Sequence, residues 1–131
     1  MATANLADAA STVDTSKDSI IIKENFESIR GGRTLVTTGF PLSVIPAGHV
    51  VIRETATGDH KPMPLDEDAY DTLPADHTYV GVVVSSVPTA KPFVGIMVRG
   101  TVNPTAAHYA YTTILAAFKT ATENRIAFIA D

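Results

Sequence analysis

A run of valine-rich sequence at positions 79–85 constrains the fold of this chain more than any other feature. The run, YVGVVVS, favours a strand and is far too short to cross a membrane. Gly81 within it marks a point where another backbone or side chain approaches. A turn carrying Pro88 separates the run from residues 93–98, its expected antiparallel mate, which residues 99–102 extend. The pair predicts the centre of an antiparallel sheet.

Further strands are expected in the first half of the chain, between turns marked by glycine and proline. They lie at residues 20–22, 33–37 and 49–53. Residues 23–29 are also compatible with a short helix. Residues 60–65 are expected to form the returning arm of a hairpin that begins after 49–53. Because the prolines in this arm cannot donate backbone hydrogen bonds, the arm is predicted at a sheet edge.

One amphipathic helix is predicted after Asn103 and Pro104, because asparagine caps helices and proline suits the first helical position. Its apolar stripe, at helical spacing, carries Ala107, Tyr111, Ile114 and Phe118. Asn124 is suited to a left-handed cap, and residues 125–130 to a short terminal strand. The expected fold class is mainly β with one α-helix, as a small antiparallel β sandwich or barrel.

The amino-terminal end differs in composition from the rest of the chain. Residues 1–19 are small, polar and acidic, with too little bulky apolar surface to offset the entropy lost on ordering. We therefore expect a flexible arm over residues 1–19. A single β-rich domain over residues 20–131 suits a chain of 131 residues. Within it, the acidic and polar residues 66–76 are expected to form an exposed loop.

Charge and residue content argue against several classes of function. The net charge is −4 and the cations are interspersed with acids, so nucleic acid is not an expected partner. The apolar stretches are too short to cross a membrane, so no membrane partner is expected either. Cysteine is absent, and the four histidines lack the spacing of a zinc site. The acidic loop lacks the central glycine and terminal glutamate of a calcium-binding EF-hand. With no recognisable nucleophile or triad, we expect no enzyme activity, no cofactor and no metal.

The apolar content indicates assembly. Apolar residues make up 45% of the chain and charged residues 18%, so part of the apolar surface is expected to be covered by a partner subunit. The loop between Pro41 and Pro46 is apolar, so we expect other protein surface to cover it. The side chains expected at an oligomer or capsid interface are Phe40, Leu42, Val44, Ile45 and Tyr109.

Several segments carry a resemblance to a known family. Residues 29–35 (IRGGRTL) and 44–52 (VIPAGHVVI) resemble the head fiber and decoration proteins of tailed phages, notably the crAss-like phages. Residues 79–84 (YVGVVV) and 95–102 (GIMVRGTV), with the following helix and terminal strand, are similar to the lambda-type head decoration (β-tulip) fold. The similarity covers roughly residues 20–131, and it departs from the lambda protein in a longer first half and in the loop of residues 62–76.

The resemblance implies a virion protein, made in the cytoplasm of the bacterial host and placed on the outer surface of the capsid. It implies a homotrimer that contacts the major capsid protein through its arm. Whether the protein is a decoration element or the base or knob of a head fiber stays open. The alternative is a receptor- or carbohydrate-binding β module, in which Tyr70, Tyr79 or Tyr109 stacks on sugars.

Overall fold

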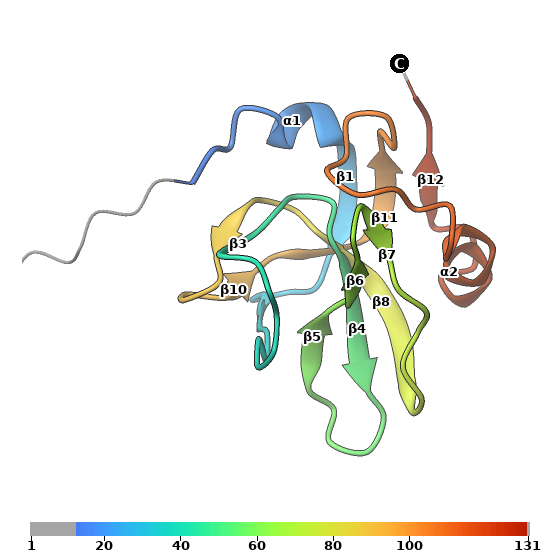
Figure 1. Ribbon diagram of the computed structural model, residues 1–131. Coiled ribbons are helices and arrows are strands. Elements are labelled where there is room, and N and C mark those ends of the chain that lie inside the picture. Colours follow the sequence, from blue (N-terminus) through green and yellow to red (C-terminus); the bar gives the residue numbers. More distant parts are fainter. Residues whose placement is uncertain (1–12, 131) are drawn as a thin grey trace, which may run out of the picture.

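The computed structural model describes residues 13–130, which form one six-stranded sheet and three two-stranded sheets (Figure 1). The order in the large sheet is β1-β11-β8-β4-β5, and β12 also pairs with β11. The β11–β12 pairing is parallel and the other pairings are antiparallel. The strands are β1 (Ile22–Ser28), β4 (Val50–Glu54), β5 (His60–Pro62), β8 (His77–Val83), β11 (Ile96–Val102) and β12 (Ile126–Phe128). The predicted mainly β, antiparallel class is confirmed.

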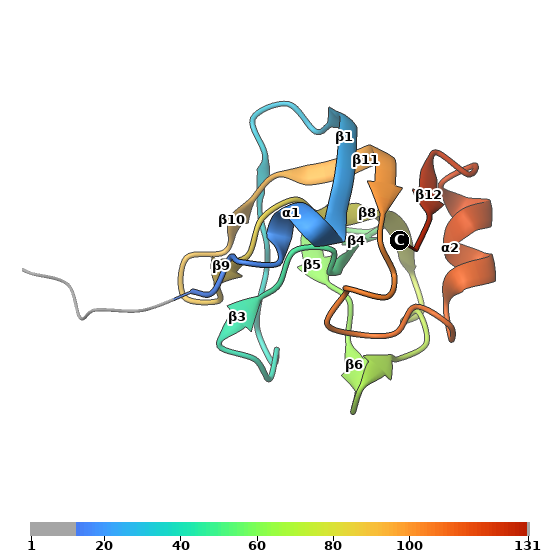
Figure 2. The same cartoon turned by 90° about the horizontal axis from the view of Figure 1, so that it is seen from above.

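Shorter elements flank this sheet. Helix α2 lies on one side of the molecule and strands β3 and β10 lie on the other, as both views show (Figure 1, Figure 2). The two-stranded sheets join β2 (Arg33–Thr34) to β10 (Phe93–Val94), β3 (Val44–Ile45) to β9 (Val87–Pro88), and β6 (Leu65–Asp66) to β7 (Ala69–Tyr70). The helices are α1 (Asp18–Ile21) and α2 (Leu115–Ala121).

The centre and one edge of the sheet lie where the sequence predicted them. Strand β8 is the middle strand, between β11 and β4. A Cβ atom at Gly81 would overlap the carbonyl oxygen of Met97, so glycine permits the close approach of β11. Strand β5 is an edge strand, and Pro62 pairs with Val51 of β4 there. An edge tolerates proline because the missing donor faces away from the sheet.

The prediction for residues 20–22 was wrong in its first part. Ile20 and Ile21 belong to α1, and the strand begins at Ile22 and continues through the residues that were also compatible with a helix. The fold therefore has a second, four-residue helix. Asp18, the first residue of α1, also makes a tertiary contact, because its carboxylate accepts hydrogen bonds from the Ser86 amide and hydroxyl at 2.8 and 2.7 Å.

The hydrogen bonds between Asp18 and Ser86 involve a residue of the arm that was predicted over residues 1–19. The expected boundary between residues 19 and 20 lies inside α1, and Asp18 is fixed to the loop after β8. Ser86 in turn accepts a hydrogen bond from the Ala47 amide at 3.0 Å. Residues 1–12 of the predicted arm lie outside the described residues.

The helix begins later than predicted. Asn103 accepts hydrogen bonds from the amides of Thr105 and Ala106 at 3.0 and 3.4 Å, but it caps a turn and α2 starts only at Leu115. The intervening segment makes a tertiary contact instead, because the Ala110 amide donates to the Asp68 carbonyl at 3.2 Å. The predicted left-handed residue is confirmed, since Asn124 has a φ of 57°.

The expected exposed loop at residues 66–76 was partly wrong. Its first half is the β6–β7 hairpin, and Tyr70 is only 2% exposed. An aromatic ring among acidic residues gave no sequence signal of burial, because its partners come from distant segments. The acids at 66–68 are exposed, as expected. We call residues 65–71 the acidic hairpin.

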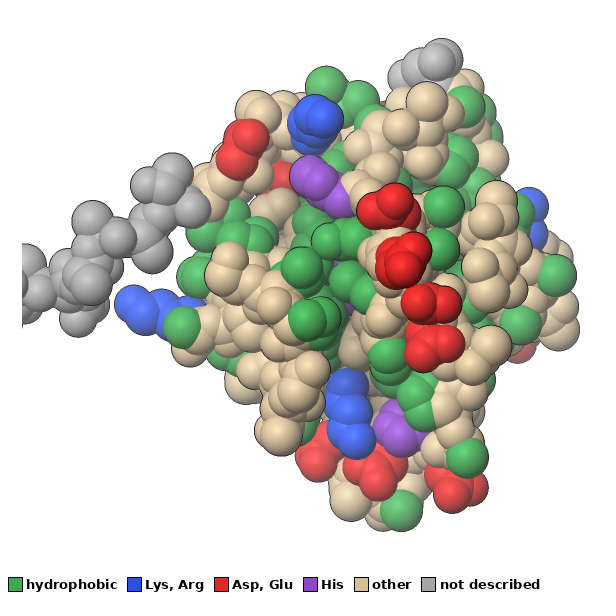
Figure 3. All heavy atoms as spheres, in the orientation of Figure 1, with side chains coloured by type: hydrophobic (Ala, Val, Ile, Leu, Met, Phe, Trp, Pro, Cys, Tyr) green, Lys and Arg blue, Asp and Glu red, His purple; other side chains and the backbone are tan. Residues whose placement is uncertain are grey.

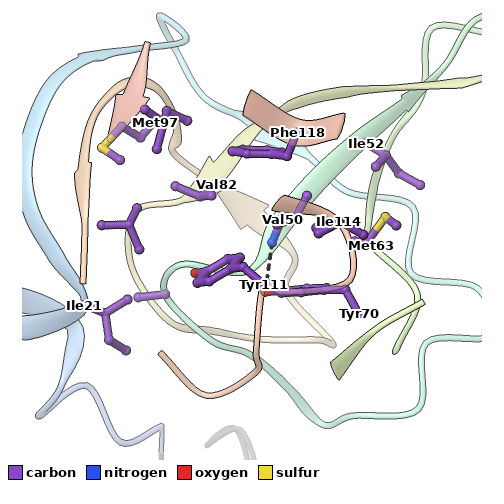
Figure 4. Close-up of a cluster of buried hydrophobic side chains, with 13 residues drawn as sticks. Ile21, Val50, Ile52, Met63, Tyr70, Val82, Met97, Tyr111, Ile114 and Phe118 are labelled. Atoms are coloured by element: carbon purple, nitrogen blue, oxygen red, sulfur yellow. Dashed lines mark hydrogen bonds between the residues drawn. The ribbon is translucent and has the colours of Figure 1, made fainter. Parts of the chain in front are cut away.

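The buried side chains form two clusters. The larger one lies between the sheet, α2 and the segment before α2, and Figure 4 shows its central members. Of the predicted helix stripe, Tyr111, Ile114 and Phe118 are buried in it. The smaller cluster lies at the β3 end of the molecule and contains Leu35, Ile45, Val51, Val83, Val94 and Ile96.

Candidate interaction surface

Three of the five predicted interface residues meet at one surface hollow. Leu42, Val44 and Tyr109 line a hollow of about 370 Å³, which we call the first hollow. The structure thus brings together two segments that are far apart in the sequence. Ile45 does not belong to this surface, because it is 0% exposed and packs in the smaller cluster. Adjacent residues of a strand point to opposite sides, so Val44 faces outward and Ile45 inward.

The first hollow also has polar walls. Asp14, Ser43, Ser86 and His108 contribute to its lining. Hydrogen bonds from Ser16 are the main cause of a lowered pKa at Asp14, and the nearby Lys17 and His108 act in the same direction. The hollow therefore combines an aromatic ring with groups that can donate and accept hydrogen bonds.

A second hollow, of about 460 Å³, contains the fourth predicted interface residue, Phe40. Four prolines line it together with Phe40, and they are Pro41, Pro62, Pro64 and Pro74. Lys61 and His77 also line it, and Lys61 forms an ion pair with Glu54 at 3.1 Å. The hydrogen bond from Lys61 is the largest cause of the lowered pKa of Glu54. The second hollow is thus mainly apolar, with an ion-paired cation and a histidine in its wall.

His49 lies beneath both hollows. Its ring makes edge contacts with Phe40 of the second hollow and Tyr109 of the first, at centroid distances of 5.3 and 6.2 Å. Its Nε2–H donates to the Met63 carbonyl at 2.9 Å. Burial lowers the pKa of His49 to about 4, so the ring is neutral near pH 7. His49 is only 1% exposed, which suits a structural role.

Two tyrosines that the sequence did not identify as partners fix the turn before His49. The Tyr111 hydroxyl donates to the Gly48 carbonyl at 2.6 Å, and the Tyr70 hydroxyl donates to it at 3.4 Å. Burial raises the pKa of both phenols. Gly48 has a φ of +81°, a conformation that favours glycine. Only the Pro-Ala-Gly turn signal was visible in the sequence, and it did not reveal these hydroxyls.

The acidic hairpin borders the two hollows. Leu65 lines the second hollow, and Ala69 forms a bridge with Ala110, next to Tyr109 of the first. Asp66, Glu67 and Asp68 are exposed. Figure 3 shows acidic side chains in a row beside hydrophobic ones on this face. An apolar surface with an acidic border is suited to a partner that carries apolar and cationic groups.

Large apolar side chains are also exposed on the molecule, one of them, Val36, in the wall of the second hollow. They are between 39% and 65% exposed, and they are Ile20, Phe26, Val36, Phe93 and Ile129. Phe26 lies on edge strand β1, where the Arg99 guanidinium lies 6.0 Å from its ring. Phe93 lies on β10, opposite Thr34 of β2. Val94, the neighbour of Phe93 in β10, is buried, whereas residues 24–28 around Phe26 are all exposed.

Two other features can be stated for the described part of the chain. Within residues 13–130, no three histidine, aspartate or glutamate side chains are arranged to hold a metal ion. The helices of the same residues include none that is long and apolar enough to cross a membrane. Of the four histidines, His49 is buried and His108 is exposed.

Comparison with known proteins gives no relative. No protein-family model matches the chain, and neither a curated protein nor a solved structure matches it significantly.

Proposed function

We propose that this chain is a structural virion protein: a homotrimer that binds the major capsid protein on the outer surface of a phage head. It serves there as a decoration element or as the base or knob of a head fiber. In this role it acts by binding and needs neither catalysis nor a cofactor. The phage assignment is supported by the resemblance of residues 29–35, 44–52, 79–84 and 95–102.

The observation that carries the assembly part is the amount of apolar side chain left at the surface. A single exposed apolar residue is ordinary on a monomeric protein. Here four large ones outside the hollows accompany two hollows with apolar walls, the second of which includes the fifth, Val36. Apolar surface of this kind marks interaction sites in soluble proteins, because covering it on association removes it from water.

Two measurements test the two parts of the proposal. Light scattering of the purified chain is expected to give three times the mass of one chain. Mass spectrometry of virions from the phage that encodes the chain is expected to detect it among the head proteins. A monomer at every concentration would contradict the proposed trimer. Absence of the chain from intact virions would contradict the proposed capsid role.

A glycan-binding module is the second candidate, and the first hollow favours it. Tyr109 there stands beside Asp14, Ser43 and His108, a combination of one aromatic surface and a few polar groups that is typical of small-ligand sites. A glycan array is expected to give a hit that Tyr109→Ala loses and Tyr109→Phe keeps, because the ring and not the hydroxyl would stack. An array without hits would dispose of this candidate.

A further inference from the structure

We propose that the first hollow and the acidic hairpin form one docking surface for a segment of a partner protein that carries lysine or arginine beside an apolar side chain. The apolar side chain enters the hollow, and the cation lies against the carboxylates of the hairpin. The identity of the partner, the capsid protein, rests on the proposed function. The docking surface adds which part of this chain meets that partner and what chemistry the partner must present.

The hollow supplies the apolar half of this surface. Leu42, Val44 and Tyr109 are half-buried, so each keeps part of its side chain available in the hollow. The Tyr109 ring is held from within the molecule, because it contacts the rings of His49 and Tyr70, each at a centroid distance of 6.2 Å. A wall that is already fixed in this way loses little freedom when a partner side chain packs against it.

The hairpin supplies the charge. Asp66, Glu67 and Asp68 are exposed, and within residues 13–130 no ion pair or hydrogen bond joins their carboxylates to another group. Three consecutive like charges repel one another, and a cation placed beside them offsets that repulsion. These acids therefore favour a cationic group on the protein that docks beside them.

The two halves adjoin because the segment before α2 is joined to the hairpin. Ala69 forms a bridge with Ala110, and the Ala110 amide donates to the Asp68 carbonyl at 3.2 Å. Tyr109 in the wall of the hollow is the residue before Ala110. Figure 3 shows the acidic side chains in a row beside hydrophobic ones on this face. One partner segment can therefore place an apolar side chain in the hollow and a neighbouring cation on the hairpin.

Charge also decides where the cation lies and what carries it. Hydrogen bonds from Ser16, and then the charge of the nearby Lys17, lower the pKa of Asp14 in the wall of the hollow. Because Lys17 already acts on Asp14, we assign the cation to the hairpin. A neutral sugar would gain nothing from the hairpin acids. Residues 1–12 of this chain contain Asp8 and neither lysine nor arginine, so they lack the side chain that the hairpin favours.

An NMR titration of the isotope-labelled full chain tests the surface with three synthetic tripeptides, acetylated and amidated at their ends. Leu-Arg-Leu is expected to shift the amide signals of Val44, Asp68 and Tyr109. It is expected to bind about fivefold more tightly than Leu-Gln-Leu, the gain that an exposed ion pair of favourable geometry gives. Leu-Glu-Leu is expected to bind least tightly. Added salt is expected to reduce the differences among the peptides, because it screens exposed charges.

Two variants separate the halves of the surface. The triple variant Asp66→Asn, Glu67→Gln and Asp68→Asn is expected to bind Leu-Arg-Leu and Leu-Gln-Leu equally. A control triple variant removes the same charge at exposed acids outside both hollows and should keep the fivefold preference: Glu24→Gln, Glu27→Gln and Glu123→Gln. Tyr109→Ala is expected to weaken binding of all three peptides by about tenfold. The dispersion of the amide signals establishes that each variant remains folded.

Several outcomes would overturn the docking surface. They are equal binding of the arginine and glutamate peptides, shifts confined to other parts of the chain, and no shift at about 10 mM Leu-Arg-Leu. A sugar that shifts the same amides and displaces the peptide would make the hollow a glycan site instead. Shifts at Val44 and Tyr109 that depend on the concentration of the chain alone would assign the hollow to a second copy.

The titration does not depend on the proposed function. If the arginine preference maps to the hollow and the hairpin but the chain is absent from virions, the docking surface is supported and the proposed capsid role fails. If the chain is found on virions but the preference is missing, the docking surface is overturned and the capsid role stands.

Discussion

Replacing Phe118 with alanine is expected to lower the free energy of unfolding by about 3–5 kcal/mol, the usual cost of truncating a buried phenylalanine. Phe118 is 0% exposed. Its ring contacts Tyr79 and Phe128 at centroid distances of 5.4 and 5.8 Å. It thereby holds α2 against β8 and the end of β12. Urea denaturation of the variant and of the unchanged chain measures the difference.

The short helix increases the effect of this substitution. Helix α2 has seven residues, and a helix of this length is not stable in water without tertiary contacts. Phe118 is its buried anchor. Phe26→Ala is the control for residue type, since Phe26 is 65% exposed, and it is expected to change the free energy of unfolding by about 0.5 kcal/mol or less. Equal losses in the two variants would contradict the role given to Phe118.

The second large effect is a loss of stability in acid caused by His49. The pKa of His49 is about 4 in the folded chain, against 6.5 for an unperturbed histidine. Below pH 6.5 the unfolded chain therefore binds a proton that the folded chain does not. The stability contributed by neutral His49 is fully present above pH 6.5 and is lost as the pH falls toward 4. The slope is about 1.4 kcal/mol per pH unit, which gives a loss of about 3 kcal/mol.

A comparison of variants isolates this contribution from the other titrating groups. His49→Gln cannot take up a proton, and its amide can still donate toward the Met63 carbonyl that His49 contacts. Free energies of unfolding at pH 7.5 and pH 4.5 are expected to differ by about 3 kcal/mol more in the unchanged chain than in this variant. His108→Gln, at an exposed position, is the control and should retain the full pH dependence. A His49→Gln chain with the same pH dependence would show that His49 does not cause it.

The sequence predicted the strands better than it predicted what surrounds them. The 79–85 run and the two prolines of residues 60–65 located the central and edge strands, because apolar runs and missing donors are local properties. The start of the helix was wrong for a nonlocal reason. Asn103 and Pro104 form a good start signal, but Ala110 hydrogen-bonds to the acidic hairpin and keeps the next residues out of a helix.

The candidate surface was predicted in part. Leu42 and Val44 lie in a proline-flanked apolar loop that is too short to bury its own side chains. They meet Tyr109 at the first hollow. The burial of Ile45 follows from strand alternation, which could be applied only once β3 was known. Phe93 lies opposite Thr34 because β10 pairs with β2, two strands far apart in the chain. No local pattern encodes that register.

The neighbours of β11 have a consequence for how the chain reaches this fold. Val102 pairs with Ile22 of β1 on one side and with Phe128 of β12 on the other. The strand therefore becomes complete only when segments from near both ends of the described chain arrive at it. Sheets dominated by such distant pairings close large loops before they gain contacts, and they fold in milliseconds to seconds instead of microseconds. Folding should thus be slow, because β1 and β12 must both reach β11 before its pairings are complete.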